Sequence, residues 1–227
     1  MSRMSVSEIM TQIAATVNQE ATPPTEASSE WTLWLAYLNR AYQEWAQAND
    51  WESLRKKGFP PVTGISQATV SLFGDFRKLA SPPNLHVDST EGTLYPELLP
   101  EQEGMYSEND KYIQIVGNSS DGFSMIFHPA SIASGASLEV QYFSEVTALA
   151  SNTQYPVSSD PQYLVDRTIA YILEARSDPR FQIEENKARE RLMTMIENNN
   201  ASKYNSYASD SPVITTGKRS GFRVGRD

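Results

Sequence analysis

The sequence predicts an α+β protein: a bundle of about four helices, a small inserted antiparallel β domain and an extended C-terminal tail. Apolar residues recur at helical spacing before residue 58 and again after residue 159. Between them, short β-prone runs are separated by proline, glycine and serine. The last stretch is polar and could not fold alone. We therefore expect four segments: 1–58 and 159–200 as the bundle, 59–158 as the β domain, and 201–227 as the tail.

The first helix is expected over residues 5–20. Ser5 and Glu8 have the spacing of a capping box, in which each side chain accepts from the other residue's backbone amide. Ile9, Ile13 and Val17 then follow on one stripe of the helix. Two prolines in the next segment separate this helix from the second.

A longer helix is expected over residues 30–57, which hold all four tryptophans. Asn49 and Asp50 are expected to kink or end it, while Lys56 and Lys57 suit a helix C-terminus. Tryptophans on a helical stripe usually belong to the core. Four within so short a stretch exceed what one face of a bundle normally buries, so two of them are candidates for a subunit interface, with a core position as the alternative. These two are Trp31 and Trp34.

The middle of the chain predicts four to six antiparallel strands in a small sandwich or barrel. The clearest β-prone runs are residues 68–73, 111–117, 123–128 and 137–146. The sequence GNSSDG between the second and third runs predicts a hairpin connection. The last run alternates apolar and polar residues, as a half-buried strand does.

Two more helices are expected after the β domain. Asp160 and Pro161 form a cap followed by proline at the first helical position, which predicts a helix over residues 159–178. A second cap and proline precede a charged helix, which we expect to end at the three asparagines of residues 198–200. No internal repeat is present.

The charge is distributed unevenly. The chain has a net charge of -9, yet residues 201–227 hold five basic and two acidic residues, which leaves 14 basic and 26 acidic residues in the first 200. The first 200 residues should repel a phosphate backbone, whereas the tail should be drawn to anions. No apolar run is long enough for a membrane span or a secretory signal, so we expect a soluble protein with no membrane partner.

The sequence offers no catalytic site, and we expect that the protein is not an enzyme. Cysteine is absent, and the two histidines, His86 and His128, lack the spacing of metal ligands. No glycine-rich phosphate loop is present either. We expect no metal and no cofactor, and a structural role for both histidines.

Several stretches in order resemble one protein family. The segment LNRAYQEWAQANDWESLRK, residues 38–56, resembles a helix of the head-to-tail adaptor proteins of tailed bacteriophages, with its LN-x-AY-x-E and DW-x-x-LRK patterns. DFRK, residues 75–78, is similar to the segment that opens the family's β insertion, although Phe73 and Gly74 replace the more usual Leu-Pro. Residues 133–173 and 188–200 resemble the passage into the third helix and the closing helix. The resemblance covers roughly residues 30–200.

This resemblance implies a function without catalysis. Adaptors of this family form a ring, usually of twelve copies, beneath the portal protein at the capsid vertex, and they extend the DNA channel towards a tail, stopper or nozzle protein. Double-stranded DNA passes through without specific binding, which suits an acidic wall. The implied location is the virion neck, after assembly in the bacterial cytoplasm.

The family's C-terminal segment commonly inserts between portal subunits, which implies that residues 201–227 dock on the portal. Residues 212–217 could add a strand to a sheet edge, and basic side chains could pair with carboxylates around an apolar anchor. The candidate portal-binding residues are Val213, Ile214, Lys218, Arg219, Phe222, Arg223 and Arg226. The alternative is a nucleic-acid-binding accessory protein that uses the same basic tail as a phosphate clamp.

Overall fold

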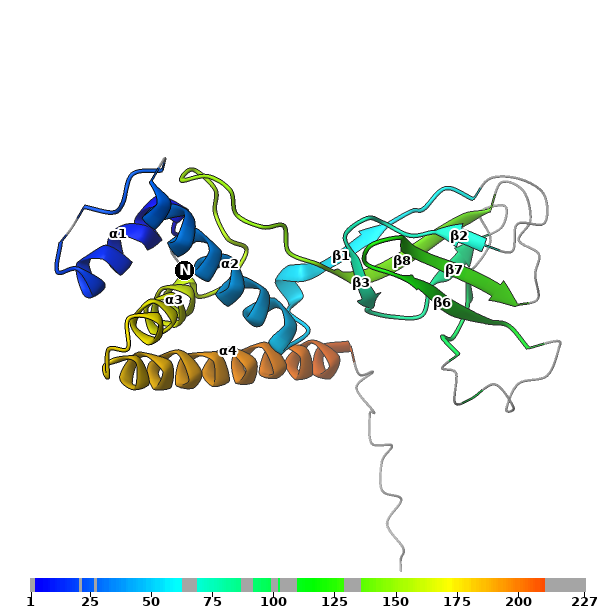
Figure 1. Cartoon of the computed structure of the whole chain (residues 1–227). Coiled ribbons are helices and arrows are strands. Elements are labelled where there is room, and N and C mark those ends of the chain that lie inside the picture. Colours follow the sequence, from blue (N-terminus) through cyan, green and yellow to red (C-terminus); the bar gives the residue numbers. More distant parts are fainter. Residues whose placement is uncertain are drawn as a thin grey trace, which may run out of the picture.

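The computed structural model describes residues 3–20, 22–26, 28–62, 69–86, 92–98, 102, 110–128 and 136–210, and only the backbone of residues 202–210. The chain has the predicted α+β fold, in which a helical unit and a β unit lie side by side (Figure 1). The helical unit comprises α1 (Val6–Val17), α2 (Ser29–Ala48), α3 (Pro161–Ala175) and α4 (Phe181–Asp210).

The predicted helix starts are confirmed. At α1, the Ser5 hydroxyl accepts from the Glu8 amide at 3.3 Å and the Glu8 carboxylate accepts from the Ser5 amide at 2.7 Å, which completes the capping box. At α3, the Asp160 carboxylate accepts from the Gln162 amide at 3.0 Å, with Pro161 in the first turn. The apolar stripes of α1, α2 and α3 meet in one buried cluster, which includes Ile9, Ile13, Trp34, Leu38, Trp45, Leu164 and Ile172.

The end of α2 agrees with one predicted alternative, since Asn49 and Asp50 do end this helix, whereas the end of α4 differs from the prediction. α2 ends at Ala48, because Asn49 is extended and its side-chain oxygen accepts from the next amide at 2.8 Å. After the short helix η1 (Glu52–Leu54), Lys56 and Lys57 lie in strand β1 (Arg55–Gly58), so their expected place at a helix C-terminus is wrong. α4 continues through residues 198–200 to Asp210, which makes the first part of the expected tail helical.

The β unit has eight strands within the described residues, more than expected, in two sheets. The first sheet contains β1, β3 (Phe76–Leu79), β4 (Asn84–His86), β5 (Thr93–Leu94) and β8 (Ser137–Ser144). β8 is its central strand: β1 pairs along one edge, while β3 and β4 follow one another along the opposite edge, all antiparallel.

The second sheet contains β2 (Thr69–Ser71), β6 (Tyr112–Asn118) and β7 (Gly122–His128) in the order β2-β7-β6. β6 and β7 form the predicted hairpin. Gly117 in β6 has a positive φ of 112°, and a Cβ there would lie 2.2 Å from the Gly122 carbonyl oxygen, so only glycine fits. Side chains of both sheets share one apolar cluster, as in a small sandwich, including Val70, Phe76, Ile113, Met125, Phe127, Leu138 and Val140.

The chain crosses between the two units twice, once from α2 into β1 and once after β8 (Figure 1). Residues 145–158, which we expected in the β domain, instead return along the helices. There the Asn39 side chain bonds both backbone groups of Leu149, donating at 2.9 Å and accepting at 2.7 Å. Tyr42 accepts from the Val157 amide at 2.9 Å. The strands of the β unit therefore span residues 55–144, and its apolar cluster shares no residue with that of the helices.

Candidate functional site

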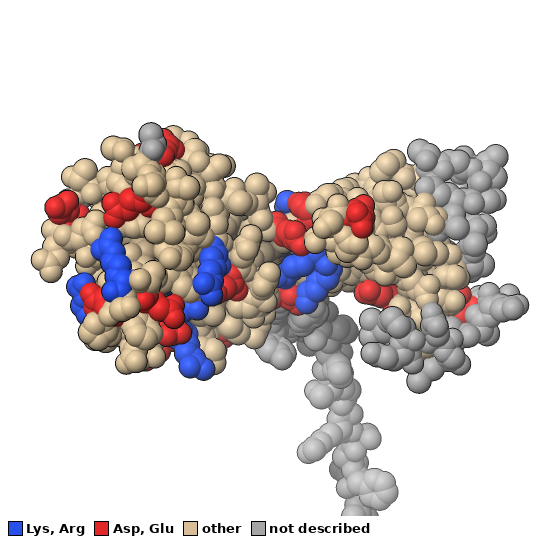
Figure 2. Space-filling model, viewed as in Figure 1, with Lys and Arg blue, Asp and Glu red and all other residues tan. Residues whose placement is uncertain are grey.

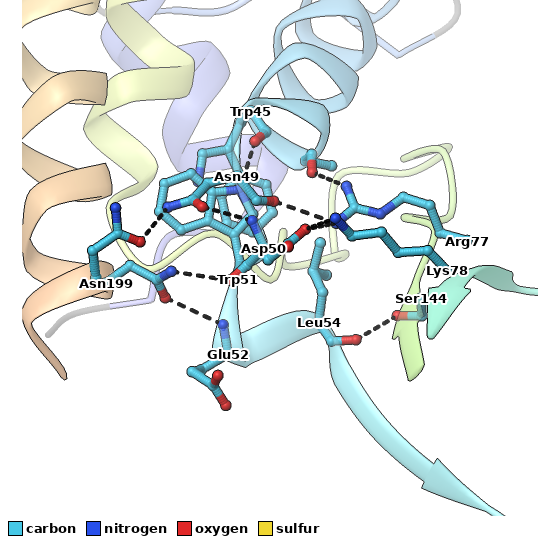
Figure 3. Close-up of polar contacts among 12 residues, drawn as sticks. Trp45, Asn49, Asp50, Trp51, Glu52, Leu54, Arg77, Lys78, Ser144 and Asn199 are labelled. Carbon is cyan, nitrogen blue, oxygen red and sulfur yellow. Dashed lines mark hydrogen bonds and ion pairs between the residues drawn. The ribbon is translucent and has the colours of Figure 1, made fainter. Parts of the chain in front are cut away.

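The junction between the two units is built around the end of α2 (Figure 3). The last carbonyl groups of a helix have no partner inside the helix. Arg77 of β3 supplies donors for this helix end. Its guanidinium donates to the carbonyl oxygens of Ala46 and, at 3.3 Å, of Asn49, and it also donates to the Asp50 carboxylate at 3.1 Å. Because a cation is favourable at a helix C-terminus, β3 caps α2 with a side chain from the other unit.

Lys78 reaches the same carboxylate, with its Nζ 2.7 Å from Asp50 Oδ1. Neighbouring residues of a regular strand point to opposite faces, so Arg77 and Lys78 would normally diverge. The register of β3 against β8 shifts between Phe76 and Lys78, and such irregularities re-aim side chains. This local shift accounts for two adjacent cations meeting one carboxylate.

Helix α4 holds the linker between α2 and β1, residues 49–54, from the side opposite Arg77 (Figure 3). The Asn199 side chain donates to the Asp50 carbonyl oxygen at 3.0 Å and accepts from the Glu52 amide at 3.2 Å, in the manner of a short strand pairing. The Asn49 side chain donates to the Asn200 side-chain oxygen at 3.3 Å. Two of the three asparagines that we expected to end the helix therefore bind the backbone and side chain of the linker.

Trp51 anchors the linker in the helical core. Its indole lies 5.1 Å from that of Trp45 at an interplanar angle of 14°, and its Nε1 donates to the Trp45 carbonyl oxygen at 2.6 Å. Trp31 and Trp34, the candidate interface residues, are only 6% and 1% exposed. Trp34 belongs to the apolar cluster of the helical unit, and Trp31 donates at 3.2 Å to the side chain of Asn152 in the returning segment. The structure places neither at a surface open to a second subunit.

Basic side chains lie beside acidic ones on the surface where the two units meet, which we call the waist (Figure 2). Lys56 pairs with Asp75 at 2.5 Å, and Lys57 pairs with Glu139 at 2.8 Å. Burial raises the pKa of Asp75, but hydrogen bonds from Lys56 and Tyr142 and the charge of Lys56 outweigh it, and the pKa lies below its usual value. These cations neutralise acids of the same chain, so the waist is not an open anion site.

An open groove of about 870 Å³ lies next to the junction, between η1, the start of α3 and α4. Trp51 and Met195 are among the apolar residues that line it. Arg191 on its wall pairs with Asp160 at 3.0 Å and with Asp166 at 3.0 Å, and thereby ties α4 to α3. The Asp160 carboxylate is thus held by an ion pair, and Glu52 and Glu190 are the other carboxylates that line the groove.

The two histidines lie in the β unit, away from the junction groove. His86 and His128 lie on β4 and β7, outside the groove, and His128 stacks on Tyr112 at 4.5 Å. Among the described residues, no three His, Cys, Asp or Glu side chains are arranged to hold a metal ion. In the same part of the chain, no helix is both long and apolar enough to cross a bilayer. All seven candidate portal-binding residues fall outside the described residues.

Sequence reasoning did not identify Asp50, Arg77 and Asn199 as functional residues. A signal was present, since Asp50 and Arg77 belong to the DW-x-x-LRK and DFRK patterns that carry the family resemblance. Their contact across the junction could not be seen from spacing, because the two patterns lie far apart in the chain. A scan against protein-family models and a search of curated protein sequences return no match to this chain.

Proposed function

We propose that this protein is a structural adaptor that joins the portal ring of a tailed bacteriophage to the tail or neck. In this proposal, copies of the chain form a ring, of twelve subunits in the related families, that extends the DNA channel. Its partners are the portal protein above and a tail, stopper or nozzle protein below. It resides in the virion neck after assembly in the host cytoplasm, with neither an enzymatic activity nor a membrane partner.

One observation supports this proposal most directly. The two sequence patterns behind the resemblance meet in space: Asp50 pairs with Arg77 and Lys78, and Lys56 pairs with Asp75. Contact between the two patterns is what the proposal requires, since it makes both of them parts of one joint. Here they form the joint between a helical body and a β insertion, which is the arrangement that the resemblance implies.

Two further features suit an adaptor. The first 200 residues carry an excess of twelve acidic groups, and an acidic wall keeps a DNA channel from binding its contents. The long helix α4 runs from the far end of the helical unit toward the β unit and ends near the junction (Figure 1). In this proposal, the residues that follow α4 in the sequence dock between subunits of the portal ring.

The test is co-expression with the portal protein encoded by the same phage genome, followed by electron microscopy of the purified particles. The full chain is expected to add a second ring to the portal. A chain shortened to residues 1–210 is expected to stay folded, as shown by circular dichroism, and to lose portal binding. A variant of the full chain with Lys218, Arg219, Arg223 and Arg226 changed to glutamine separates the contribution of charge from that of length.

Two outcomes would contradict the proposal at different levels. If the full chain formed no ring with or without portal, the adaptor role would be refuted. If the shortened chain bound portal as well as the full chain, only the docking role of the tail would fail. Retention of duplex DNA that weakens with salt at a slope corresponding to about four phosphates would favour the nucleic-acid-binding alternative.

A further inference from the structure

The linker between α2 and β1 is held at three points by side chains of different elements. Arg77 of β3 binds the carbonyl oxygens at the end of α2 and the Asp50 carboxylate. Asn199 of α4 binds the backbone on either side of Trp51. On the second crossing, the Ser144 hydroxyl donates to the Leu54 carbonyl oxygen at 3.2 Å (Figure 3). The orientation of the β unit therefore depends on a few side chains at one place.

These contacts are polar, and several are open to water. Side-chain exposure is 19% for Arg77, 34% for Asp50 and 52% for Lys78. The apolar clusters of the two units share no residue, so no common core fixes one unit on the other. Units joined by small polar interfaces move relative to one another by default. The bonds made by Arg77 and Asn199 are partly exposed, so water can replace these partners, whereas the bond from Ser144 to Leu54 is buried and lies at the second crossing, about which the unit turns.

We infer that this junction is a releasable joint, in which the cap by Arg77 and the clasp by Asn199 hold the β unit in one orientation. When both are released, the β unit swings about the two chain crossings near residues 51–55 and 144–146. The helical unit and the β unit each stay folded, because each keeps its own apolar cluster. This inference does not depend on the proposed adaptor role.

The position of Asn199 means that a movement of α4 can release the joint. Asn199 and Asn200 lie on α4, the helix that leads to the C-terminal residues. A displacement of this part of α4 therefore acts on the clasp without touching the β sheets. Trp51 stays anchored through the Trp45 carbonyl and serves as the fixed point from which the β unit turns.

The test is a distance measurement between the two units of the full chain by pulsed electron spin resonance. The chain contains no cysteine, so Ala15→Cys on α1 and Ser119→Cys in the β6–β7 turn introduce two unique label positions on exposed residues. The labelled protein is expected to show one narrow distance distribution. Adding Arg77→Ala together with Asn199→Ala is expected to broaden this distribution or to add a second maximum, with an unchanged circular dichroism spectrum.

The matched control is Lys57→Gln. Its partner, Glu139, lies on the neighbouring strand of the same sheet, so this change removes a waist ion pair without touching the joint. The control is expected to retain the narrow distribution. If Arg77→Ala with Asn199→Ala reduces the helical content, the variant Arg77→Gln with Asn199→Ser replaces it, because it keeps more of the side-chain bulk. The same broadening of the distance distribution is expected for this variant. A folded joint variant with the original narrow distribution would overturn the inference, as would equal broadening by the control.

Discussion

Replacing Trp51 with phenylalanine tests how the end of α2 is stabilised. Trp51 is 2% exposed, and its Nε1 donates at 2.6 Å to the Trp45 carbonyl oxygen, one of the last four of the helix. Trp51→Phe leaves that carbonyl without this donor, at a cost of about 1–2 kcal/mol. The smaller ring also leaves a cavity worth about 1 kcal/mol. The expected loss in the free energy of unfolding is therefore about 2–3 kcal/mol.

The neighbouring tryptophan provides a matched control. Trp45 is 0% exposed and stacks on Trp51, but its Nε1 has no hydrogen-bond partner among the described residues. Trp45→Phe therefore leaves a similar cavity while removing an unsatisfied donor instead of a hydrogen bond. We expect a loss of about 1 kcal/mol or less, since relief of the buried donor offsets part of the cavity.

Urea denaturation followed by far-ultraviolet circular dichroism measures both variants. With a denaturant slope of about 2 kcal/mol/M, Trp51→Phe should lower the midpoint by about 1–1.5 M, and Trp45→Phe by about 0.5 M or less. The reasoning is wrong if Trp45→Phe is as destabilising as Trp51→Phe, because the hydrogen bond to the helix end would then carry no measurable share.

Two other outcomes are expected. Asn39→Ala removes both hydrogen bonds to the Leu149 backbone, and should lower stability by about 1–2 kcal/mol and speed limited proteolysis within residues 145–158; unchanged cleavage would contradict this. Burial, together with the nearby Glu44 carboxylate, raises the pKa of Tyr163 and Tyr171 from 10 to about 12. Because the folded-state pKa of each tyrosine lies above that of the unfolded chain, the neutral phenols contribute to the free energy of unfolding. This contribution is complete below pH 10 and is lost as pH rises towards 12. A spectrophotometric titration in which every tyrosine ionises near pH 10 would contradict it.

Local patterns accounted for the elements whose signals are themselves local. The capping box at Ser5, the cap and proline at Asp160 and Pro161, and the turn between β6 and β7 all formed as predicted. Each depends on residues within a few positions of one another. Their geometry is set by backbone hydrogen bonding that needs no distant partner.

Predictions failed where a distant residue competes with the local preference. Lys56 and Lys57 are good helix residues, yet β8 supplies strand pairing for both, Asp75 before β3 pairs with Lys56, and Glu139 of β8 pairs with Lys57. The three asparagines would end an isolated helix, but Asn199 and Asn200 gain hydrogen bonds from the linker and α4 continues to Asp210. Of the two alternatives for Trp31 and Trp34, the core position is the one found: Trp34 lies in the helical apolar cluster, and Trp31 bonds Asn152 of the segment after β8, a contact that no periodicity within α2 reveals.

The sequence by itself determined the α+β class, the helix starts, the hairpin and the contrast between an acidic body and a basic end. These properties depend on composition, periodicity and short spacing. Only the tertiary structure decided that α2 ends at Asn49 and Asp50 instead of bending there, which residues belong to each unit, and how the units are joined. The joint depends on Asp50, Arg77 and Asn199, which are separated by long stretches of chain. Bonds of this kind depend on how the whole chain folds, so no single segment of the sequence contains them.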